Sequence, residues 1–517
     1  MKKTMDEFRA AWPQLSPAGD TCRVPARDLP LVAAWWREAG ARLADAFALA
    51  DPGSPRDYLV RYVFEAPPDA FVTMESPVTG TPPAYPAVSL HLHAADWFER
   101  EIYEMYGVLP EGHPALGGFV LHRQGEGDPF PLRKNFARST PLPGASCVSH
   151  PHQAQGRGVF EMPLGPVYAG VAESIHFTLT SIGEEVFWVV PQLFFKHRGL
   201  EKAGEDIPLE RVLQMVRRIS GIGAVSESLA FCQAVETAAG TEVPPRGLFL
   251  RSLLAELERI YNHVGNLADI CESTSLGVGA AQGFVLRERL LRLNCLLSGS
   301  RYLMNAIGFG GVLRDPGPER ISLMRDTLRA LAGDFRRWIA ALLATDSFLD
   351  RLQNIGVLDS GAAANLGATG PVGRASGIDR DWRRDHVYAA YGRLEFRVPV
   401  ESEGDGLARL KVRAAEVEES LALVEQLVSS LPGGPPQNPR PPELAPGAAA
   451  SGYCEGPRGA VLHWISAGED NRLWRLRLRP PSLLNWHTFP QATEGCAFQD
   501  FPIILASFGL SLAESDR

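Results

Sequence analysis

Cysteine pairs at metal-binding spacing are missing from this sequence of 517 residues. It contains seven cysteines, and no two of them form a C-x-x-C motif. Zinc ribbons and cysteine-ligated iron–sulfur clusters normally use such closely spaced pairs. The sequence therefore predicts reduced, mostly buried thiols rather than a metal centre or a disulfide framework.

Long apolar runs are missing too. A membrane-spanning helix needs roughly 18 apolar residues, whereas the most apolar stretch, FWVVPQLFF at 187–195, is short and contains Pro191. The start of the chain, MKKTMDEFRAAWPQ, has no hydrophobic core of a signal peptide. We expect a soluble chain that reaches a membrane only through partner subunits.

Two further function classes have little support. The net charge is −9 and the pI is about 5.8, which argues against a nucleic-acid-binding surface. The glycine-rich stretch GIGAVSES is only weakly similar to a phosphate-binding loop and follows no clear strand. We expect neither nucleic acid nor a nucleotide cofactor on this chain.

The length and the ordinary content of hydrophobic residues, 45%, predict two to four domains with sizeable cores. Residues 1–136 mix a predicted helix at 32–49 with predicted strands at 56–66 and 85–93, which indicates a small α+β domain. Residues 137–158 are rich in Pro, Gly, Ser and His and read as a linker.

The remainder, 159–517, begins with predicted strands at 175–182 and 184–195. Apolar residues at helical spacing then predict four long helices of a bundle, at 248–270, 284–307, 319–344 and 407–431. Residues 431–450 form a second loop rich in Pro and Gly. Two strand-like runs and a small C-terminal unit complete the chain.

The first distinctive motif is ADWFEREIYEMYGVLPEGHPAL at 95–116, followed by FPLRKNF at 130–136. Its aromatic residues have the spacing of one helix face, and Gly107 is expected to end the helix. Glu99, Arg100, Glu101 and Glu104 are expected to face water. The whole motif resembles the signature of a small peripheral-arm subunit of respiratory complex I.

The second motif is GPVYAGVAESIHFTLTSIGEEV at 165–186, with FFKHRGLEK at 194–202. It resembles the complex I subunit that lines the quinone cavity, and the catalytic subunits of membrane-bound nickel–iron hydrogenases, including formate hydrogenlyase. LLAELERIYNH, GATGPVGRASGIDRDWRRD, EGPRG and the terminal FPIILASFGLSLAESDR fit the same family in the same order. The resemblance implies an α+β chain: a small N-terminal α/β domain, then a mainly helical, hydrogenase-large-subunit-like domain with small flanking sheets.

The hydrogenase members of this family hold nickel and iron with four cysteines. The resemblance places these positions at Ser220, Gly223, Ser511 and Glu514. Soft thiolates suit such a centre, whereas two hydroxyls, a carboxylate and a bare glycine do not. We expect a lost metal site and no active nickel–iron hydrogenase; a hard ion on Ser220, Ser511 and Glu514 is the alternative.

The quinone-binding groups of complex I are also altered. The two histidines of its loop fall on Tyr168 and Ala172, and its tyrosine falls on Phe231, which cannot donate a proton. The resemblance implies a cavity that is lined by Tyr168, Phe231 and Arg374. This cavity lacks the tyrosine hydroxyl that would bind the quinone by a hydrogen bond. For Arg374 the alternative is a helix cap.

Several residues have roles that the resemblance suggests for proton and electron transfer. Glu173 and His176 match an E-x-x-H segment that begins a proton path, and Glu227 stands where relatives often have histidine. For Glu173 the alternative is an ordinary surface carboxylate near a strand start. His197 and Arg198 correspond to residues beside an iron–sulfur cluster of the adjacent subunit; the alternative is an ion-pair network at a helix start.

The resemblance as a whole implies a peripheral-arm subunit of a membrane-bound, complex I-like (NADH–quinone oxidoreductase-like or formate hydrogenlyase-like) electron-transfer complex, on the cytoplasmic side of the inner membrane. Its expected partners are an iron–sulfur small subunit, other peripheral-arm subunits and membrane-arm subunits. The chain itself is expected to hold no cofactor; quinone is a candidate substrate, and NAD(H) would bind only other subunits. The alternative is a catalytically inert structural or conformational coupling module.

Overall fold

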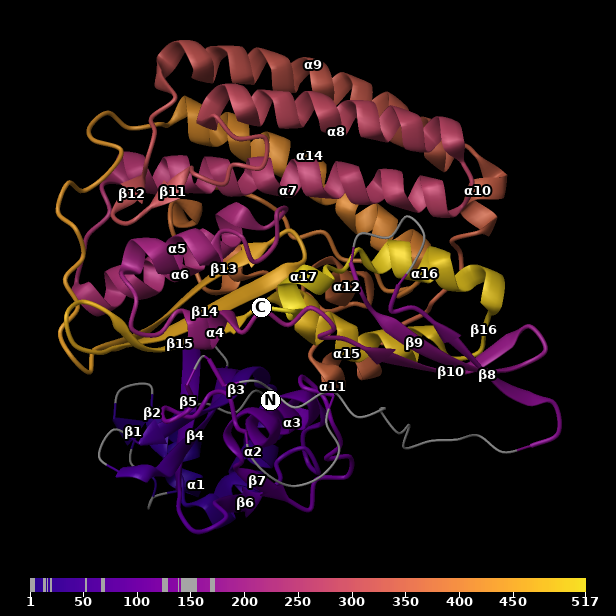
Figure 1. Cartoon of the computed structure of the whole chain (residues 1–517). Helices are drawn as coiled ribbons and strands as arrows, with labels where there is room; N and C mark the ends of the chain where they lie inside the picture. The colour runs from indigo at the N-terminus through magenta and orange to yellow at the C-terminus, as the bar shows by residue number, and fades with distance from the viewer. Residues whose placement is uncertain are drawn as a thin grey trace.

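The computed structural model describes residues 5–12, 15, 17–18, 21–51, 54–66, 70–122, 129–137, 139–140, 156–167 and 173–517. Figure 1 shows the N-terminal part in indigo beneath a larger body, in which long helices lie above a layer of strands and short helices. Most of the predicted linker at 137–158 lies outside the described residues. The mixture of helices and small sheets confirms the predicted α+β class.

The N-terminal part is built on a five-stranded sheet in the order β1-β2-β5-β4-β3. Strands β3, β4 and β5 pair antiparallel, while β2 joins β5 in parallel. Its elements are α1 (Met5–Ala11), β1 (Pro17–Ala18), β2 (Thr21–Arg23), α2 (Leu29–Glu38), β3 (Arg42–Asp51), β4 (Ser54–Ala66), β5 (Ala70–Val78), β6 (Ala84–Pro86), α3 (Asp96–Tyr106) and β7 (Leu109–Glu111).

The predicted helix at 32–49 is wrong in its second half. The helix α2 ends at Glu38, and 42–51 form strand β3. Every residue from 43 to 50 is buried, so this strand is covered on both faces and shows no alternation of polar and apolar residues. The predicted strand at 85–93 is also shorter, because β6 stops at Pro86.

Helix α3 ends at Gly107, whose left-handed φ of 69° confirms the predicted stop. The expectation that Glu99 and Glu101 face water is wrong, since both are buried. The carboxylate of Glu99 accepts hydrogen bonds from the Tyr62 hydroxyl at 2.7 Å and from the Val88 amide at 2.6 Å. These partners come from distant segments, so the helix pattern alone could not reveal them.

The C-terminal part holds the predicted helical bundle. Helix α7 packs against α8 and α14, and α9 packs against α8; Figure 1 shows these four helices as the upper layers of the molecule. The helices up to the bundle's end are α4 (Leu200–Ala203), α5 (Leu209–Val216), α6 (Ala224–Ala239), α7 (Pro245–Ser273), α8 (Gly277–Ser298), α9 (Gly317–Leu343), α10 (Asp346–Asp350), α11 (Ser360–Leu366), α12 (Gly370–Ala375), α13 (Trp382–Asp385) and α14 (Gly406–Ser429).

Small sheets flank the bundle, as predicted. One has the order β16-β10-β9-β8, a second β13-β14-β15, and β11 pairs with β12. The remaining elements are β8 (Val159–Leu164), β9 (His176–Ile182), β10 (Glu185–Gln192), β11 (Ile307–Gly308), β12 (Gly311–Val312), β13 (Ala449–Gly456), β14 (Gly459–Ala467), β15 (Leu473–Arg479), α15 (Pro481–Thr493), β16 (Cys496–Ala497), α16 (Phe501–Phe508) and α17 (Leu512–Ser515).

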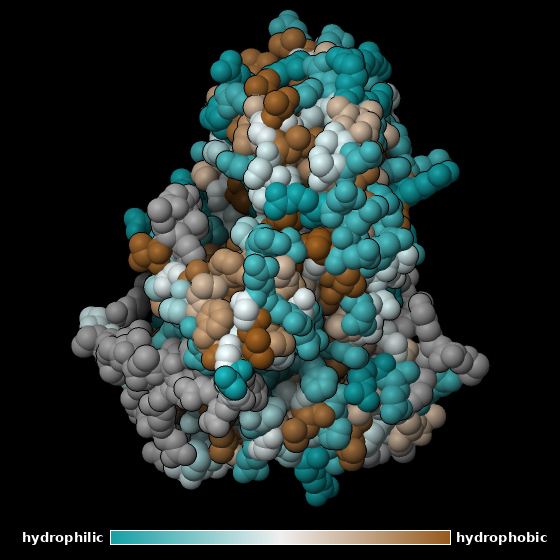
Figure 2. Space-filling view, turned by 90° about the vertical axis from the view of Figure 1, so that its right-hand side faces the viewer, coloured by the Kyte–Doolittle hydropathy of each residue, from teal (hydrophilic) through white to brown (hydrophobic). Residues whose placement is uncertain are grey.

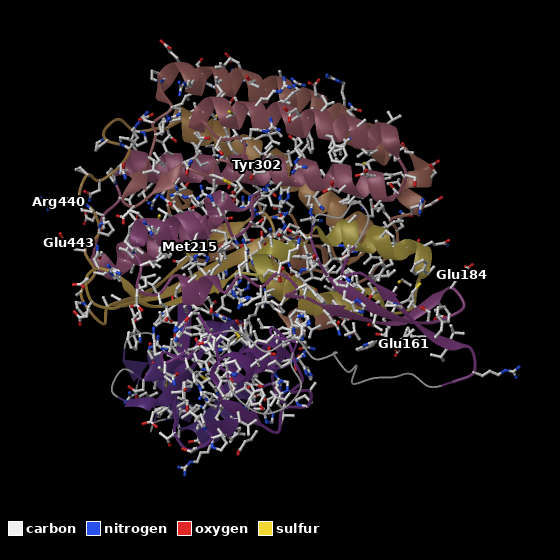
Figure 3. All side chains as sticks on the ribbon, viewed as in Figure 1. Glu161, Glu184, Met215, Tyr302, Arg440 and Glu443 are labelled. Atoms are coloured by element: carbon white, nitrogen blue, oxygen red, sulfur yellow. The ribbon has the colours of Figure 1, made fainter. Side chains whose placement is uncertain are left out.

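The segment at 431–448 is a loop, as its proline and glycine content predicted. It is held at its middle, where the Gln437 amide donates to the Phe309 carbonyl at 2.9 Å and the Asn438 backbone N–H donates to the Gly310 carbonyl at 2.9 Å. Figure 3 shows Arg440 and Glu443 at the outer edge of the molecule. The loop therefore wraps the outside of the bundle.

The two parts of the chain are joined by a buried ionic cluster. The guanidinium of Arg477 on β15 contacts Asp45 of β3 at 2.8 Å and Glu101 of α3 at 3.1 Å. Arg517 contacts Glu101 as well, and also Glu201 at 3.2 Å. The last residue of the chain is thus fixed between the two parts, which also fixes the preceding residues of α17.

Within the described residues, no helix is both long and apolar enough to span a bilayer. Figure 2 shows hydrophobic residues scattered among hydrophilic ones on the face that it presents. Single exposed apolar residues of this kind are normal on protein surfaces.

Candidate functional site

The two segments that the resemblance aligns with cysteine-bearing segments of hydrogenases meet in space. A Cβ atom built on Gly223, the residue before α6, would lie 3.4 Å from Oε1 of Glu514 on α17. Ser220 precedes Gly223 by three residues, Ser511 precedes Glu514 by three, and both serines are buried. The Ser511 hydroxyl accepts a hydrogen bond from the Glu514 backbone N–H at 3.4 Å. The backbone of Gly223 and the carboxylate of Glu514 therefore lie side by side.

The Glu514 carboxylate is buried and has two polar partners. The Ser482 hydroxyl donates to Oε2 at 2.5 Å, and Nη1 of Arg458 lies 3.3 Å from Oε1. Arg458 is itself oriented by a hydrogen bond to the Gly509 carbonyl at 2.8 Å. Burial raises the pKa of Glu514 to about 7, and nearby Glu227 adds to the rise, while Arg458 and Ser482 oppose it.

Glu173 belongs to the same cluster. Its Oε2 accepts a hydrogen bond from the Leu512 backbone N–H at 2.5 Å, and its Oε1 lies 3.4 Å from the Ser511 hydroxyl. The carboxylate therefore caps the start of α17, a few residues from Glu514. His176 lies elsewhere, at the start of β9. Its Nδ1 atom is 3.2 Å from the carbonyl oxygen of Gly165.

Glu227 lies in the first turn of α6 and is buried. Its Oε2 is 2.6 Å from Nε2 of His463 on β14, a second buried residue. The start of α6 is also capped by Glu258 of α7, which accepts hydrogen bonds from two backbone N–H groups, those of Val225 at 2.7 Å and Ser226 at 2.9 Å. Burial raises the pKa of Glu258 to about 7.

Arg198 ties these segments together through their backbones. Its guanidinium donates to the Arg218 carbonyl at 3.0 Å, the Ile219 carbonyl at 2.7 Å and the Ala513 carbonyl at 2.6 Å. It thus cross-links the turn before α6 to α17. Its neighbour His197 is half-buried. Desolvation together with the Arg517 charge lowers the pKa of His197 to about 4, so this imidazole is neutral at pH 7.

The described cavity positions do not join the cluster around Glu514. Phe231 is fully buried in the main core, with its ring centroid 6.0 Å from that of Phe309. Arg374 is also fully buried, and it pairs at 2.8 Å with each of the carboxylates of Glu416 and Glu455. Tyr168 lies outside the described residues.

Sequence reasoning missed three residues that define the cluster: Arg458, His463 and Ser482. Arg458 stands in the motif EGPRG and His463 follows it within strand β14. Arg458 was therefore visible as part of the resemblance, although no role was attached to it. Ser482 has no sequence signal, because only the fold brings α15 against α17.

The donor set does not fit a nickel–iron centre. Gly223 offers no ligand atom, and the Glu514 carboxylate is already held by Ser482 and Arg458. Within the described part of the chain, no group of three or more His, Cys, Asp or Glu side chains is arranged to hold a metal ion. The Glu514 carboxylate faces the guanidinium of Arg458 instead of a metal ligand set.

Comparison with known protein families agrees with this architecture. Residues 22–141 match the family of the 30 Kd subunit of respiratory-chain NADH dehydrogenase. Residues 278–450 and 440–517 match the family of its 49 Kd subunit.

Individual relatives match most of the chain. Formate hydrogenlyase subunit 5 of Escherichia coli (strain K12) is 32% identical, covering 89% of this chain and 82% of the relative. Hydrogenase-4 component G of the same organism is also 32% identical, covering 89% and 81%. The C/D subunit of NADH-quinone oxidoreductase from Acinetobacter baumannii (strain AYE) is 28% identical, covering 82% and 78%.

A solved structure shares the fold. A protein of the membrane-bound sulfane sulfur reductase, an archaeal respiratory membrane complex, superposes with a TM-score of 0.66 at 28% identity; the match covers 71% of this chain and all of the other. The chain therefore belongs to the family of complex I-type subunits in which counterparts of the 30 Kd and 49 Kd subunits are fused, together with formate hydrogenlyase subunit 5 and hydrogenase-4 component G.

Proposed function

We propose that this chain is a peripheral-arm subunit of a membrane-bound, complex I-like electron-transfer complex, and that it handles protons where hydrogenase relatives hold nickel and iron. The observation that carries the proposal is the position of the Glu514 carboxylate, 3.4 Å from where a side chain at Gly223 would begin. An ionisable acid here takes the space of a thiolate. Its charge is balanced by Arg458 rather than by a metal.

The cluster has the properties of a proton-holding site. A pKa of about 7 lets Glu514 bind or release a proton near neutral pH, where general acids and bases work best. Glu173 contacts the same short helix, and Glu227 raises the pKa of Glu514 through its charge. Glu227 in turn contacts the imidazole of His463, a side-chain type that proteins commonly use to shuttle protons.

The proposed electron-transfer role depends on cofactors that partner subunits hold. In this proposal His197 and Arg198 lie beside an iron–sulfur cluster of the adjacent subunit, where the Arg198 charge would favour cluster reduction. The chain itself holds no cofactor, and NAD(H) binds only other subunits. Quinone is the candidate acceptor. The complex faces the cytoplasm, with this chain reaching the membrane through its partners.

A structural or conformational coupling module is the second candidate. It is favoured by Phe231, which lies in the main core and has no hydroxyl to offer a substrate. The Arg458 guanidinium also contacts one oxygen of the Glu514 carboxylate. In that case the buried acids would stabilise the folded conformation of the subunit and would not transfer protons.

The two candidates differ in turnover. The complex would be purified with its native partners and assayed for reduction of quinone analogues and low-potential dyes, with proton uptake recorded. The variants are Glu514→Gln and Glu227→Gln, and the control is Glu443→Gln on the exposed loop. We expect both cluster variants to assemble with intact clusters and to lose roughly 100-fold or more in turnover, with the control unchanged. Full turnover in both variants would overturn the proton-handling proposal and favour the coupling module.

A further inference from the structure

Strand β15 presents three arginines to the junction between the two parts of the chain. Arg475, Arg477 and Arg479 alternate along the strand, so their side chains leave the same face. Their exposed fractions are only 1%, 3% and 0%. A buried guanidinium needs a compensating charge, because burying an isolated ion is costly.

The first two of these arginines have such compensation. Arg475 pairs with Glu205 at 2.5 Å, and Arg477 pairs with Asp45 at 2.8 Å. Arg479 differs: it donates to the Ala460 carbonyl and lies over the Trp382 ring, 5.2 Å from its centroid. Among the described residues no carboxylate lies within 4 Å of Arg479, and its Nε and Nη2 atoms are buried without a hydrogen-bond partner.

A second arginine faces the same place from the N-terminal sheet. Arg42 at the start of β3 donates to the Ala368 carbonyl, and its buried Nε has no hydrogen-bond partner. Arg42 and Arg479 line one small cavity of about 20 Å³, together with Arg380, Glu65 and other residues of both parts. A cavity of this size exceeds the roughly 10–15 Å³ that one water-sized occupant requires.

The cavity has more positive than negative charge. Glu65 faces the cavity and lies 3.6 Å from both Arg380 and His386. Burial alone would raise the pKa of Glu65, but His386, Arg42 and Arg380 outweigh burial and hold it at about 2. The other lining carboxylate, Glu455, pairs with Arg374 at 2.8 Å. The three lining guanidinium groups, those of Arg42, Arg380 and Arg479, therefore face two lining carboxylates. One of these carboxylates already pairs with Arg374, and Arg380 also contacts Asp385 at 3.8 Å.

We propose that this cavity binds one small monovalent inorganic anion of halide size, such as chloride, held by Arg42 of β3 and Arg479 of β15. The anion supplies the charge that the third arginine of β15 lacks, and it joins the N-terminal sheet to the C-terminal part. The site has room of only about 20 Å³ beside its arginines, which favours a single small ion over a larger organic anion such as gluconate. This proposal does not rest on the proton-handling role proposed for the cluster around Glu514.

The test measures thermal unfolding of the full chain while chloride replaces gluconate at constant ionic strength. A ligand that binds only the folded state raises the unfolding midpoint in a saturable way. We expect such a rise for the natural chain, and an equal rise with bromide. Crystals grown in bromide should then show its anomalous signal at the cavity, between Arg42 and Arg479.

The variant Arg42→Gln separates a specific site from a general salt effect. It removes one cation at the rim and should abolish the chloride-dependent rise, while Arg337→Gln on the exposed face of α9 should leave it intact. The proposal is overturned if the midpoint is the same in chloride and gluconate. It is also overturned if Arg42→Gln keeps the full rise, or if the cavity holds only water or an adventitious ion that solution binding does not reproduce.

Discussion

The Glu514 carboxylate and the backbone of Gly223 lie against each other, with Oε1 3.4 Å from the position of an absent Cβ atom. The resemblance to hydrogenases aligns these two residues with two of the four metal-binding cysteines. A glycine on one side makes room for the longer carboxylate on the other, and Arg458 supplies a positive charge at 3.3 Å. The altered residues therefore form a packed and neutralised cluster.

A side chain that extends beyond Cβ at position 223 should crowd Glu514, because the Cβ atom itself would already be in contact at 3.4 Å. We predict that Gly223→Cys lowers the free energy of unfolding by about 1–3 kcal/mol, the usual cost of overpacking. Urea unfolding would measure it. The double variant Gly223→Cys with Glu514→Ala should recover part of the loss, whereas Gly433→Cys, at a position with open space around it, should cost little. An equal loss in the single and double variants would contradict the contact.

Glu514 should contribute a fall in the stability of the chain as pH rises from about 4.5 to about 7. The folded-state pKa of Glu514, about 7, is above its ordinary value of 4.5, so the folded state binds more protons in between. The stabilisation is complete below pH 4.5 and is lost as pH passes 7, with a slope of up to about 1.4 kcal/mol per pH unit for one group.

Replacing this acid should flatten that dependence. Glu514→Gln removes one proton-binding group and should reduce the slope of unfolding free energy against pH between about 5 and 7. Glu258 has the same raised pKa and should maintain the remaining slope. Urea unfolding at several pH values would measure both chains. An unchanged slope in Glu514→Gln would show that Glu514 does not titrate in this range.

The junction between the two parts depends on Arg477. Arg477→Met leaves Asp45 buried without its cation, and we predict a loss of about 3–5 kcal/mol in unfolding free energy, as for other broken buried pairs. Arg336→Met removes an exposed pair with Glu418 and should cost at most about 1 kcal/mol. Limited proteolysis should also cut the N-terminal part faster in Arg477→Met. Similar small losses in both variants would contradict the role of the junction.

Gly107 is needed for its backbone conformation and for the space around it. Its φ is 69°, and an added Cβ would lie 2.4 Å from the Arg133 guanidinium and 2.6 Å from the Phe130 ring. Gly183 has a similar φ of 61° but open surroundings. We predict that Gly183→Ala costs about 1 kcal/mol of unfolding free energy, and that Gly107→Ala costs clearly more. Equal costs would mean that the Arg133 and Phe130 side chains move away freely.

Sequence patterns predicted the long elements well for a physical reason. Helices such as α7 and α9 repeat apolar residues over many turns, and this periodicity has no other explanation. The segment at 42–51 failed because its residues from 43 to 50 are buried on both faces. In the sequence, an alanine-rich segment without alternating polar and apolar residues is equally compatible with a helix and with a strand.

The site was only partly predictable. The resemblance aligned Gly223 and Glu514 with two cysteine positions, and in the structure the two residues lie in contact. The partners of Glu514 could not follow from it, because Ser482 comes from α15 and Arg458 from the turn between two strands. Buried charges depend on such long-range contacts, and sequence spacing carries no information about them.

The nickel content of the complex, purified with its native partners and still able to reduce an electron acceptor, tests the central claim most directly. The account predicts far less than one nickel per chain, because glycine, two serines and a carboxylate bound to arginine replace the thiolates. One nickel per chain would contradict the account, since it would require ligands that the cluster around Glu514 does not provide.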